Sequence, residues 1–456
     1  MDVETLIVGA GISGLSAAFF LRQAGRDVAV IEAAPRAGGN VHTLHHAGYL
    51  LEAGPNTLLD NTPAIRALIE GLGLAGSLRE ANPKAVRRYV VRDGRSVELP
   101  GSPRAFLSTR LFSARGKLRL LAEPFIRRAA REESVAEFVR RRLGQEFLDW
   151  AIDPFVSGVY AGDPARLSVR AATAKVYALE DEHGSLLKGA VKKAFRARRA
   201  EVQTGPVGRM LSFEQGLGQL VDALAASLFD RLHLDTPALV LRHVDGRWRV
   251  DTPRGVYSAK EVVLAVPAQM VAELLEARSG DLDMFTEHGV RALREIPYPH
   301  VASVALGFRR EDVGHPLDGF GILIPSREGL VTLGALFSST LFAGRAPDGH
   351  VSLTAFIGGR RHEDVGAWSN EKVLDRVLAD LGPILGIRAL PSMVHINRWP
   401  HAIPQYELGH LERIAALDEA LAAHPGLYTR ANWRDGVSVS DCIRNARALA
   451  ERMTTR

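Results

Sequence analysis

Three closely spaced glycines near the start of the chain form the first pattern with chemical meaning. They are Gly9, Gly11 and Gly14. They follow a β-branched strand predicted over 4–8 and precede a helix predicted over 15–24. In such a turn the first glycine permits the tight bend, the second lets the backbone approach a pyrophosphate, and the third lets helix and strand pack closely. The phosphates then lie at the helix N-terminus, where free N–H groups favour negative charge.

An acidic residue and a second glycine pair extend this pattern. Glu32 ends a second predicted strand over 27–31 and lies 23 residues after Gly9. At this spacing an acidic side chain accepts hydrogen bonds from ribose hydroxyls. The pair Gly38 and Gly39 resembles the extended fingerprint of flavoproteins with two dinucleotide-type domains, which an NAD-dependent dehydrogenase would not need. The sequence therefore favours FAD as the cofactor.

The composition excludes several classes of protein. The chain has 456 residues, of which 46% are hydrophobic, and this apolar content is too high for a disordered protein. Cys442 is the single cysteine, so a disulfide scaffold is excluded. No apolar run approaches the roughly 20 residues that a transmembrane helix needs. The N-terminus runs directly into the first strand, so we expect no signal or transit peptide and a cytoplasmic protein.

The net charge of +5 hides an uneven distribution. Residues 84–199 hold 25 Lys and Arg against 13 Asp and Glu, a net charge of +12, so the rest of the chain carries −7. A basic block on an acidic protein suggests an anionic partner, which could be nucleic acid, a membrane surface or a carboxylate-bearing substrate. The alternative interpretation is a set of solvated Arg-rich faces in the protein of a GC-rich genome.

The length predicts two to four domains at roughly 100–200 residues each. A flavoprotein of this type returns repeatedly to its nucleotide domain, so the division is discontinuous. We expect an FAD-binding domain over 1–57, 206–275 and 405–456, a substrate-binding domain over 58–83 and 276–404, and a basic helical domain over 84–205. The further predicted elements are hairpins over 87–99 and 238–251, strands over 261–267, 301–308, 321–324 and 351–357, helices over 114–130, 134–143 and 370–381, and a final helix from Ser440.

Several longer stretches resemble the oxygen-dependent, FAD-containing protoporphyrinogen oxidase family. Residues 153–164 read DPFVSGVYAGDP and residues 399–406 read WPHAIPQY. Shorter matches are EHGSL at 182–186 and SSTLF at 338–342, the latter continuing to Arg345. These matches occur in the family's order, and the resemblance covers essentially the whole chain.

The resemblance implies both a fold and a reaction. The fold would be α/β (α+β), with a discontinuous Rossmann-like FAD-binding domain, a mixed-sheet substrate domain and a helical membrane-associating domain. The reaction would be the six-electron oxidation of protoporphyrinogen IX to protoporphyrin IX in heme biosynthesis. Molecular oxygen would reoxidise the flavin and hydrogen peroxide would be released. The histidines show no metal-ligand spacing, and no metal is expected.

The resemblance also assigns site residues. Arg88 matches an arginine that pairs with a substrate propionate, and a guanidinium fork suits a carboxylate. Leu323 and Phe342 match an apolar pair that packs on the pyrrole rings. Gly162 matches a catalytic glycine whose backbone carbonyl has been proposed to assist proton removal. The fingerprint and the resemblance together place these residues against FAD: Gly9, Gly11, Ser13, Gly14, Glu32, Arg36, Gly38, Gly39, Gly54, Pro55, Asn56, Val240, Trp399, Asn432, Val437 and Val439.

Other functions stay open at this point. The nearest is oxidation of coproporphyrinogen III to coproporphyrin III, and a more distant one is an amine oxidase or carotenoid desaturase. A nucleic-acid adaptor is disfavoured because Arg interleaved with Leu and Phe on helices suits a membrane surface better. We therefore expect peripheral contact with an anionic membrane, the bacterial inner membrane, through 84–199 with help from 188–199. The oligomeric state is open, with a homodimer among the alternatives.

The sequence departs from the family near its end. A glycine that the family places before a flavin-contacting turn is replaced by Ala431, ahead of Asn432. The methyl group is tolerated only if the backbone φ there is negative. Cys442 shows no sign of a covalent link to flavin, which separates the chain from monoamine oxidases.

Overall fold

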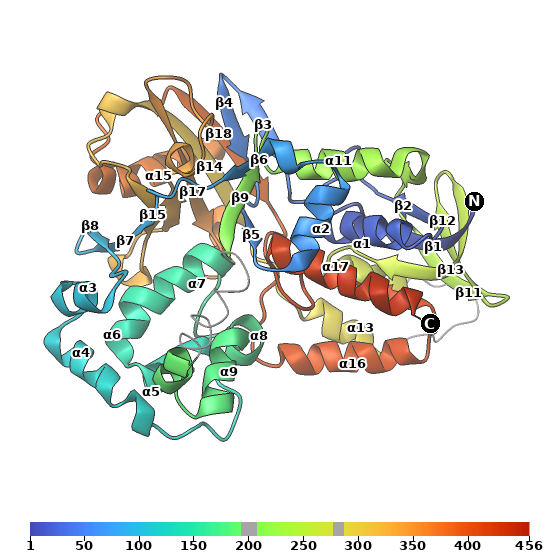
Figure 1. Ribbon diagram of the computed structural model, residues 1–456, viewed down its shortest axis with the longest axis horizontal. Coiled ribbons are helices and arrows are strands. Elements are labelled where there is room, and N and C mark those ends of the chain that lie inside the picture. Colours follow the sequence, from blue (N-terminus) through green and yellow to red (C-terminus); the bar gives the residue numbers. More distant parts are fainter. Residues whose placement is uncertain (193–207, 277–286, 456) are drawn as a thin grey trace.

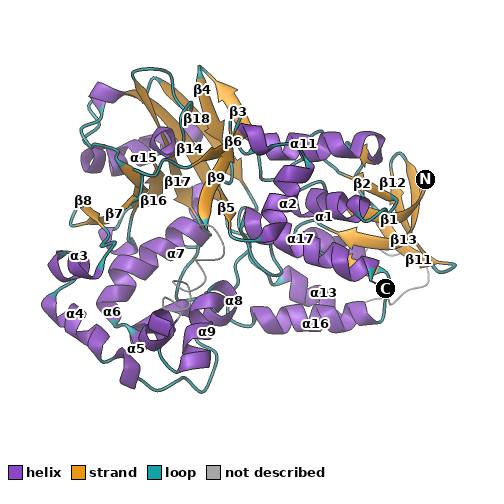
Figure 2. Cartoon of the chain, in the orientation of Figure 1, coloured by secondary structure: helices purple, strands orange, loops and turns teal. Residues whose placement is uncertain are grey.

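The computed structural model describes residues 1–192, 208–276 and 287–455. Two strand-rich bodies lie side by side, and a cluster of helices lies beneath one of them (Figures 1 and 2). Parallel strands form the centre of the first sheet, in which β1 (Asp2–Val8) pairs with β2 (Val28–Ile31) and β13 (Gly255–Leu264). Its seven strands are ordered β10-β2-β1-β13-β12-β11, with β19 beside β13. The other members are β10 (Leu232–His233), β11 (Val240–Val244), β12 (Arg247–Thr252) and β19 (Leu427–Thr429).

Helices from distant parts of the chain cover both faces of this sheet. One face packs against α1 (Ile12–Gln23), α2 (Pro63–Gly71), α11 (Gly218–Leu228) and α17 (Val439–Thr454). The opposite face packs against α12 (Ala268–Glu276), α13 (Glu287–Arg294) and α16 (His410–Ala422). The central strands are apolar runs because parallel strands covered on both faces contact no water.

A second sheet of seven strands has the order β18-β14-β17-β16-β15-β7-β8. Its strands are β18 (Met393–Trp399), β14 (Val301–Arg309), β17 (His350–Gly358), β16 (Thr332–Leu336), β15 (Gly319–Leu323), β7 (Arg87–Arg92) and β8 (Arg95–Glu98). The helix α15 (Asn370–Leu385) covers one face. The β7–β8 hairpin turns at Asp93 and Gly94, which have φ values of 54° and 70°. It joins this sheet through β15, although the division from sequence places it with the helical segment.

The helical cluster follows the hairpin. Its helices are α3 (Pro103–Ser108), α4 (Ala114–Leu121), α5 (Val135–Arg142), α6 (Gln145–Phe147), α7 (Asp153–Tyr160), α8 (Val169–Ala172) and α9 (Ala174–His183). The helix predicted over 114–130 was too long, since α4 ends at Leu121 and a short 3₁₀ turn with Pro124 follows. The predicted capping box of Ser134 and Glu137 at the start of α5 is confirmed. Among the described residues no helix is long and apolar enough to cross a membrane.

Short strands connect the larger parts. β3 (Thr43–His46) pairs with β4 (Tyr49–Glu52), while β9 (Arg209–Phe213) lies between β5 (Leu58–Asp60) and β6 (Leu78–Glu80). A one-turn helix, α14 (Ser338–Leu341), follows β16. The basic residues predicted over 193–199 to help membrane binding lie outside the described residues.

Candidate active site

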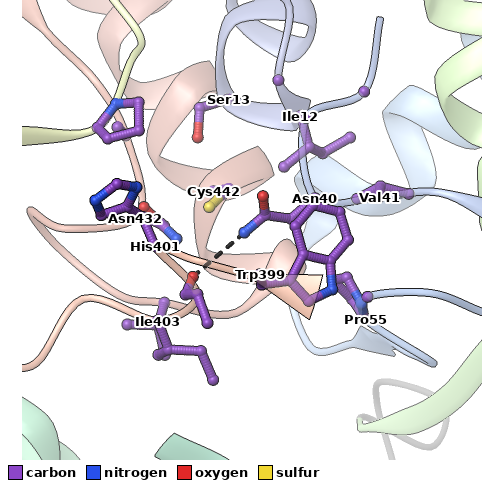
Figure 3. Close-up of a pocket in the computed structure, with 18 of the residues that line it drawn as sticks. Ile12, Ser13, Asn40, Val41, Pro55, Trp399, His401, Ile403, Asn432 and Cys442 are labelled. Atoms are coloured by element: carbon purple, nitrogen blue, oxygen red, sulfur yellow. Dashed lines mark hydrogen bonds between the residues drawn. The ribbon is translucent and has the colours of Figure 1, made fainter. Parts of the chain in front are cut away.

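A cavity of about 910 Å³ runs from the carboxyl ends of the central strands of the first sheet to the inner strands of the second sheet. Open α/β sheets bind ligands at this edge, because the connecting loops diverge there. Figure 3 shows side chains from both ends of the chain, such as Ile12, Asn40, Trp399 and Asn432, facing one another across it. Its volume lies at the upper end of the range for a ligand-binding pocket.

The glycine turn forms the phosphate end of the cavity. Gly9 has a φ of 106°, which favours glycine. A Cβ on Gly14 would lie 2.0 Å from the carbonyl oxygen of Gly9, so no side chain fits there. A Cβ on Gly11 would meet no protein atom within 4 Å, and Gly11 lines the cavity. The turn therefore leaves bare backbone at the start of α1, as a pyrophosphate requires.

Glu32 lies at the end of β2 with its carboxylate held by backbone groups. The amide of Ala10 donates to one carboxylate oxygen at 2.7 Å, and the amide of Ala34 donates to the other at 2.9 Å. Glu32 also lines the cavity. Each oxygen keeps a further lone pair, so the fixed carboxylate can accept hydrogen bonds from a ribose.

The second glycine pair lies directly against the first turn. The amide of Gly38 donates to the carbonyl of Ala10 at 2.7 Å. The side chain of Arg36 donates to the carbonyls of Ala37 and Gly39, at 3.1 and 2.7 Å, and it does not line the cavity. Burial lowers the pKa of Arg36, and nearby Glu32 partly offsets this effect. Arg36 therefore shapes the loop.

In the middle of the cavity, hydrogen bonds join the second sheet and the segment after it to the loops that carry Asn40 and Ala53. The indole N–H of Trp399 donates to the carbonyl of Ala53 at 2.8 Å, and the hydroxyl of Ser303 donates to the same oxygen at 2.7 Å. The side-chain amide of Asn40 donates to the carbonyl of Ala402 at 3.3 Å, shown dashed in Figure 3. These bonds join the cofactor end to the second sheet and to the segment after β18.

The loop before α17 closes the cavity from the C-terminal end of the chain. Asn432, Val437 and Val439 line the wall, as does Ala431. The φ of Ala431 is not positive, so its methyl group is compatible with the backbone. Cys442 also lines the cavity, and burial raises the pKa of its thiol to about 11, which keeps it protonated.

Most residues predicted to contact FAD lie together on this wall. Thirteen line the cavity: Gly9, Gly11, Ser13, Glu32, Gly38, Gly39, Gly54, Pro55, Asn56, Trp399, Asn432, Val437 and Val439. Gly14, Arg36 and Val240 do not, and Ala238 and Leu239 take the place of Val240. The bare glycine backbone, the fixed Glu32 carboxylate and the length of the cavity fit a dinucleotide cofactor.

The four residues predicted for substrate and catalysis do not line the cavity, but each lies next to a residue that does. A Cβ on the lining residue Gly158 would touch Leu323 at 2.3 Å. Phe342 belongs to a small apolar cluster against which the lining residues Phe320 and Leu336 pack. The guanidinium of Arg88 lies over the ring of Phe320, 5.5 Å from its centre. Gly162 follows the lining residue Ala161 and faces the side-chain oxygen of Gln405.

Several lining residues were not identified from the sequence. Asn40 and Val41 follow the second glycine pair, and Val266 and Pro267 follow β13. The rule that ligands lie at the carboxyl ends of parallel strands could have located these four. The apolar wall on the second sheet carries no such signal in sequence. It consists of Phe320, Leu333, Leu336 and Phe356.

Comparison with known proteins assigns the family. The model of the flavin-containing amine oxidoreductases matches residues 12–454. The chain belongs to this family. It is therefore an FAD-dependent oxidoreductase, and the predicted cofactor and α/β fold class are confirmed. Among the described residues, no group of three His, Cys, Asp or Glu side chains is placed to hold a metal ion.

The similar proteins include enzymes named for two porphyrinogens. Protoporphyrinogen oxidase 2 of Arabidopsis thaliana is 33% identical over 96% of this chain and 91% of its own. Coproporphyrinogen III oxidase of Bacillus subtilis is 30% identical over 98% and 96%. A solved structure from Exiguobacterium sp. 255-15, provisionally described as a protoporphyrinogen oxidase, has a TM-score of 0.83 at 28% identity and covers 99% of both chains. Reduced UDP-galactopyranose mutase, at 16% identity and a TM-score of 0.77, covers 100% of this chain and 94% of its own and shares the fold alone.

Proposed function

We propose that this flavoenzyme oxidises protoporphyrinogen IX to protoporphyrin IX, with molecular oxygen as the acceptor and hydrogen peroxide as the second product. The observation that carries the proposal is the apolar wall of the cavity on the second sheet. Phe320, Leu333, Leu336 and Phe356 form this wall beyond the cofactor residues. Flat apolar rings suit a tetrapyrrole macrocycle, and the names of the similar enzymes support the same substrate class.

The residues of the chain position the two reactants. Bound FAD supplies the electron acceptor, and its chemistry belongs to the cofactor. The hydrogen bonds of Trp399 and Ser303 to Ala53 hold the cofactor wall against the second sheet. Ala161 lines the cavity with a φ of 48°, so the sharp turn that carries Gly162 borders the proposed substrate. We propose that the carbonyl of Gly162 assists proton removal there.

Arg88 is the proposed anchor for a propionate. Its neighbour Arg87 pairs with Glu98 and Asp318, whereas Arg88 forms no ion pair with any described residue. Arg88 is exposed and lies over Phe320, so its guanidinium is free at the edge of the apolar wall.

An R88A variant tests this role. We expect KM for the porphyrinogen to rise about tenfold with little change in kcat, because a charge-assisted hydrogen bond to a non-reacting group is lost. R88K should restore part of the affinity. R95A, an exposed arginine on the same hairpin, is the matched control. An unchanged KM in R88A contradicts the propionate contact.

The choice of substrate is tested directly with both porphyrinogens. Purified holoenzyme is incubated with protoporphyrinogen IX or coproporphyrinogen III, and the porphyrin formed is followed by fluorescence. We expect higher kcat/KM for protoporphyrinogen IX. Faster turnover of coproporphyrinogen III would assign the second candidate, which the Bacillus relative's name supports. Peroxide release from amines without porphyrin formation would overturn both.

We also propose that the protein is cytoplasmic and binds peripherally to an anionic membrane through its helical cluster. Four large apolar side chains in and next to α3 and α4 are exposed: Leu107, Leu118, Leu121 and Phe125. Phe125 is 86% exposed, and α4 carries Arg115, Lys117 and Arg119 beside this patch. Apolar side chains interleaved with cations suit the lipid headgroup region of a membrane.

The oligomeric state, with a homodimer among the alternatives, stays a prediction.

Vesicle co-sedimentation tests the membrane contact. The variant L118S/L121S/F125S should lose most of its binding to anionic vesicles, because three exposed anchors are removed. L390S is the matched control, since Leu390 is 83% exposed outside the patch. Binding that depends on neither anionic lipid nor salt would contradict the proposal.

A further inference from the structure

The hydroxyl of Tyr406 is inserted into the loop that closes the FAD cavity. It donates to the carbonyl of Asn432 at 2.5 Å and accepts from the amide of Gly436 at 2.9 Å. Asn432 lines the cavity, and Val437 follows Gly436 on the same wall. Tyr406 itself does not line the cavity and is 5% exposed.

The two backbone groups that bond to the Tyr406 hydroxyl have the sequence spacing of a helical hydrogen bond. The carbonyl of Asn432 and the amide of Gly436 are four residues apart, the separation of a helical hydrogen bond. The tyrosine hydroxyl bridges both groups and so takes the place of a direct bond between them. Without the hydroxyl, the loop must rearrange so that the two backbone groups bond to each other, or leave both groups unpaired, and an unpaired buried group is unfavourable.

Tyr406 is held firmly on its other sides. Its ring stacks on His410 with centres 4.1 Å apart and planes 11° apart. Its carbonyl accepts from the amide of Ser168, at 2.8 Å, in the turn before α8. The side-chain amide of the preceding Gln405 donates to the carbonyls of Tyr160 and Ile403, each at 2.9 Å. The tyrosine therefore joins the helical cluster to the cofactor loop.

The protonation states of this stack suit the arrangement. Burial raises the pKa of Tyr406 well above its usual value, so the hydroxyl keeps the proton that it donates. Burial lowers the pKa of His410 to about 4, so the stacked imidazole is neutral at physiological pH. Neither ring introduces a charge behind the cofactor wall.

We propose that Tyr406 is a positioning residue that holds the loop from Ala431 to Val439 in place as a wall of the FAD cavity. The inference rests on FAD as the cofactor and is independent of which porphyrinogen is the substrate. Tyr406 lies outside the cavity lining and its hydroxyl bonds to two backbone groups of the loop, so it acts through the loop.

The test is Y406F, which removes the hydroxyl and keeps the ring stack. We expect the dissociation constant of FAD to rise about tenfold, because the loop loses one buried hydrogen-bonding group. The visible spectrum and the midpoint potential of the bound flavin should also shift. The control is Y49F, because Tyr49 is 3% exposed, does not line the cavity, and its hydroxyl bonds to Ser392 Oγ at 3.3 Å.

Each outcome decides the inference. The inference would be overturned if FAD affinity, flavin spectrum and midpoint potential in Y406F equalled those of wild type. It would also be overturned if Y406F and Y49F changed them equally. Should Y406F not fold, hydrogen exchange on the wild-type holoenzyme gives the answer. The Gly436 amide should then exchange as slowly as the first bonded amides of α17, and rapid exchange would refute the bridge. A wild-type protein that holds no flavin would instead contradict the function itself.

Discussion

Gly11 and Gly14 lie in the same turn under different constraints. Gly14 is closely packed against the backbone, since a Cβ at this position would lie 2.0 Å from the Gly9 carbonyl oxygen. Gly11 has open space and a φ of −70°, which any residue adopts. The fold therefore requires a glycine at position 14, whereas the cofactor requires a glycine at position 11.

The variant G11A should separate these two requirements. We expect the free energy of unfolding of the apoprotein to stay within about 0.5 kcal/mol of wild type, because nothing in the protein is displaced. FAD affinity should fall at least tenfold, because the methyl group occupies the approach of the pyrophosphate. Chemical denaturation and FAD titration measure the two quantities.

G76A is the matched control for this prediction. Gly76 is exposed, and its Cβ would also meet no atom within 4 Å. Normal FAD affinity in G11A would show that the pyrophosphate does not approach this glycine.

At the scale of elements, the helical cluster is organised around a buried ion network. Arg142 on α5 is fully buried and donates to Glu180 on α9 at 2.8 Å from Nε. It also pairs with Glu123, 3.2 Å away and fully buried. The carboxylate of Glu123 in turn accepts from the hydroxyl of Ser185 at 2.6 Å. One guanidinium thus joins three segments of the cluster.

R142M should destabilise this cluster by about 3–5 kcal/mol, because the fully buried Glu123 loses its ion-pair partner and Glu180 keeps only its pair with Arg141 among the described residues. R140M is the control, since Arg140 is exposed on the same helix. Thermal unfolding followed by circular dichroism measures the difference. Equal effects of the two variants would show that the network contributes nothing specific.

The same network predicts a loss of stability in acid. Burial alone would raise the pKa of Glu180, but hydrogen bonds from Arg141 and Arg142 outweigh it and lower the pKa. The folded protein therefore binds this proton less readily than the unfolded chain. The stabilisation is present above about pH 4.5, the ordinary value for Glu, and is lost as the pH falls below it. R142M should weaken that dependence in denaturation measured across this range.

At the scale of the whole molecule, the cavity is the contact between two sheets. The pair formed by Glu52 and Arg345, 3.5 Å apart and buried, adds a second link between β4 and the segment after α14. Burial raises the pKa of Glu52 and lowers that of Arg345, so each charge depends on the other. A ligand that fills the cavity contacts both bodies at once.

Removing FAD should therefore lower the stability of the whole chain rather than of one domain. At a free concentration about 100 times its dissociation constant, a ligand adds about 2.7 kcal/mol. We expect the apoprotein to unfold at a lower temperature, and added FAD to restore the transition in proportion to its concentration. If FAD raised the unfolding temperature of only one of two separate unfolding transitions, the two sheet-containing bodies would not be coupled.

The sequence by itself determined the local chemistry. The turn of Gly9, Gly11 and Gly14, the acid at Glu32 and the capping box of Ser134 depend on neighbours in the chain, and the structure has each of these features. All of them lie within single motifs of the chain, the longest being the strand–helix–strand unit that places Glu32 beside the glycine turn, so local geometry leaves little choice. The family resemblance extended this to most of the cavity lining.

Only the tertiary structure decided which distant segments meet. The apolar wall of Phe320 and Phe356 and the bridge from Tyr406 to Asn432 and Gly436 depend on sheet register and on loops packed from opposite ends of the chain. The β7–β8 hairpin joins the second sheet for the same reason. Such contacts arise because burying apolar surface brings remote segments together, and the residues involved carry no mark of their partners in the sequence.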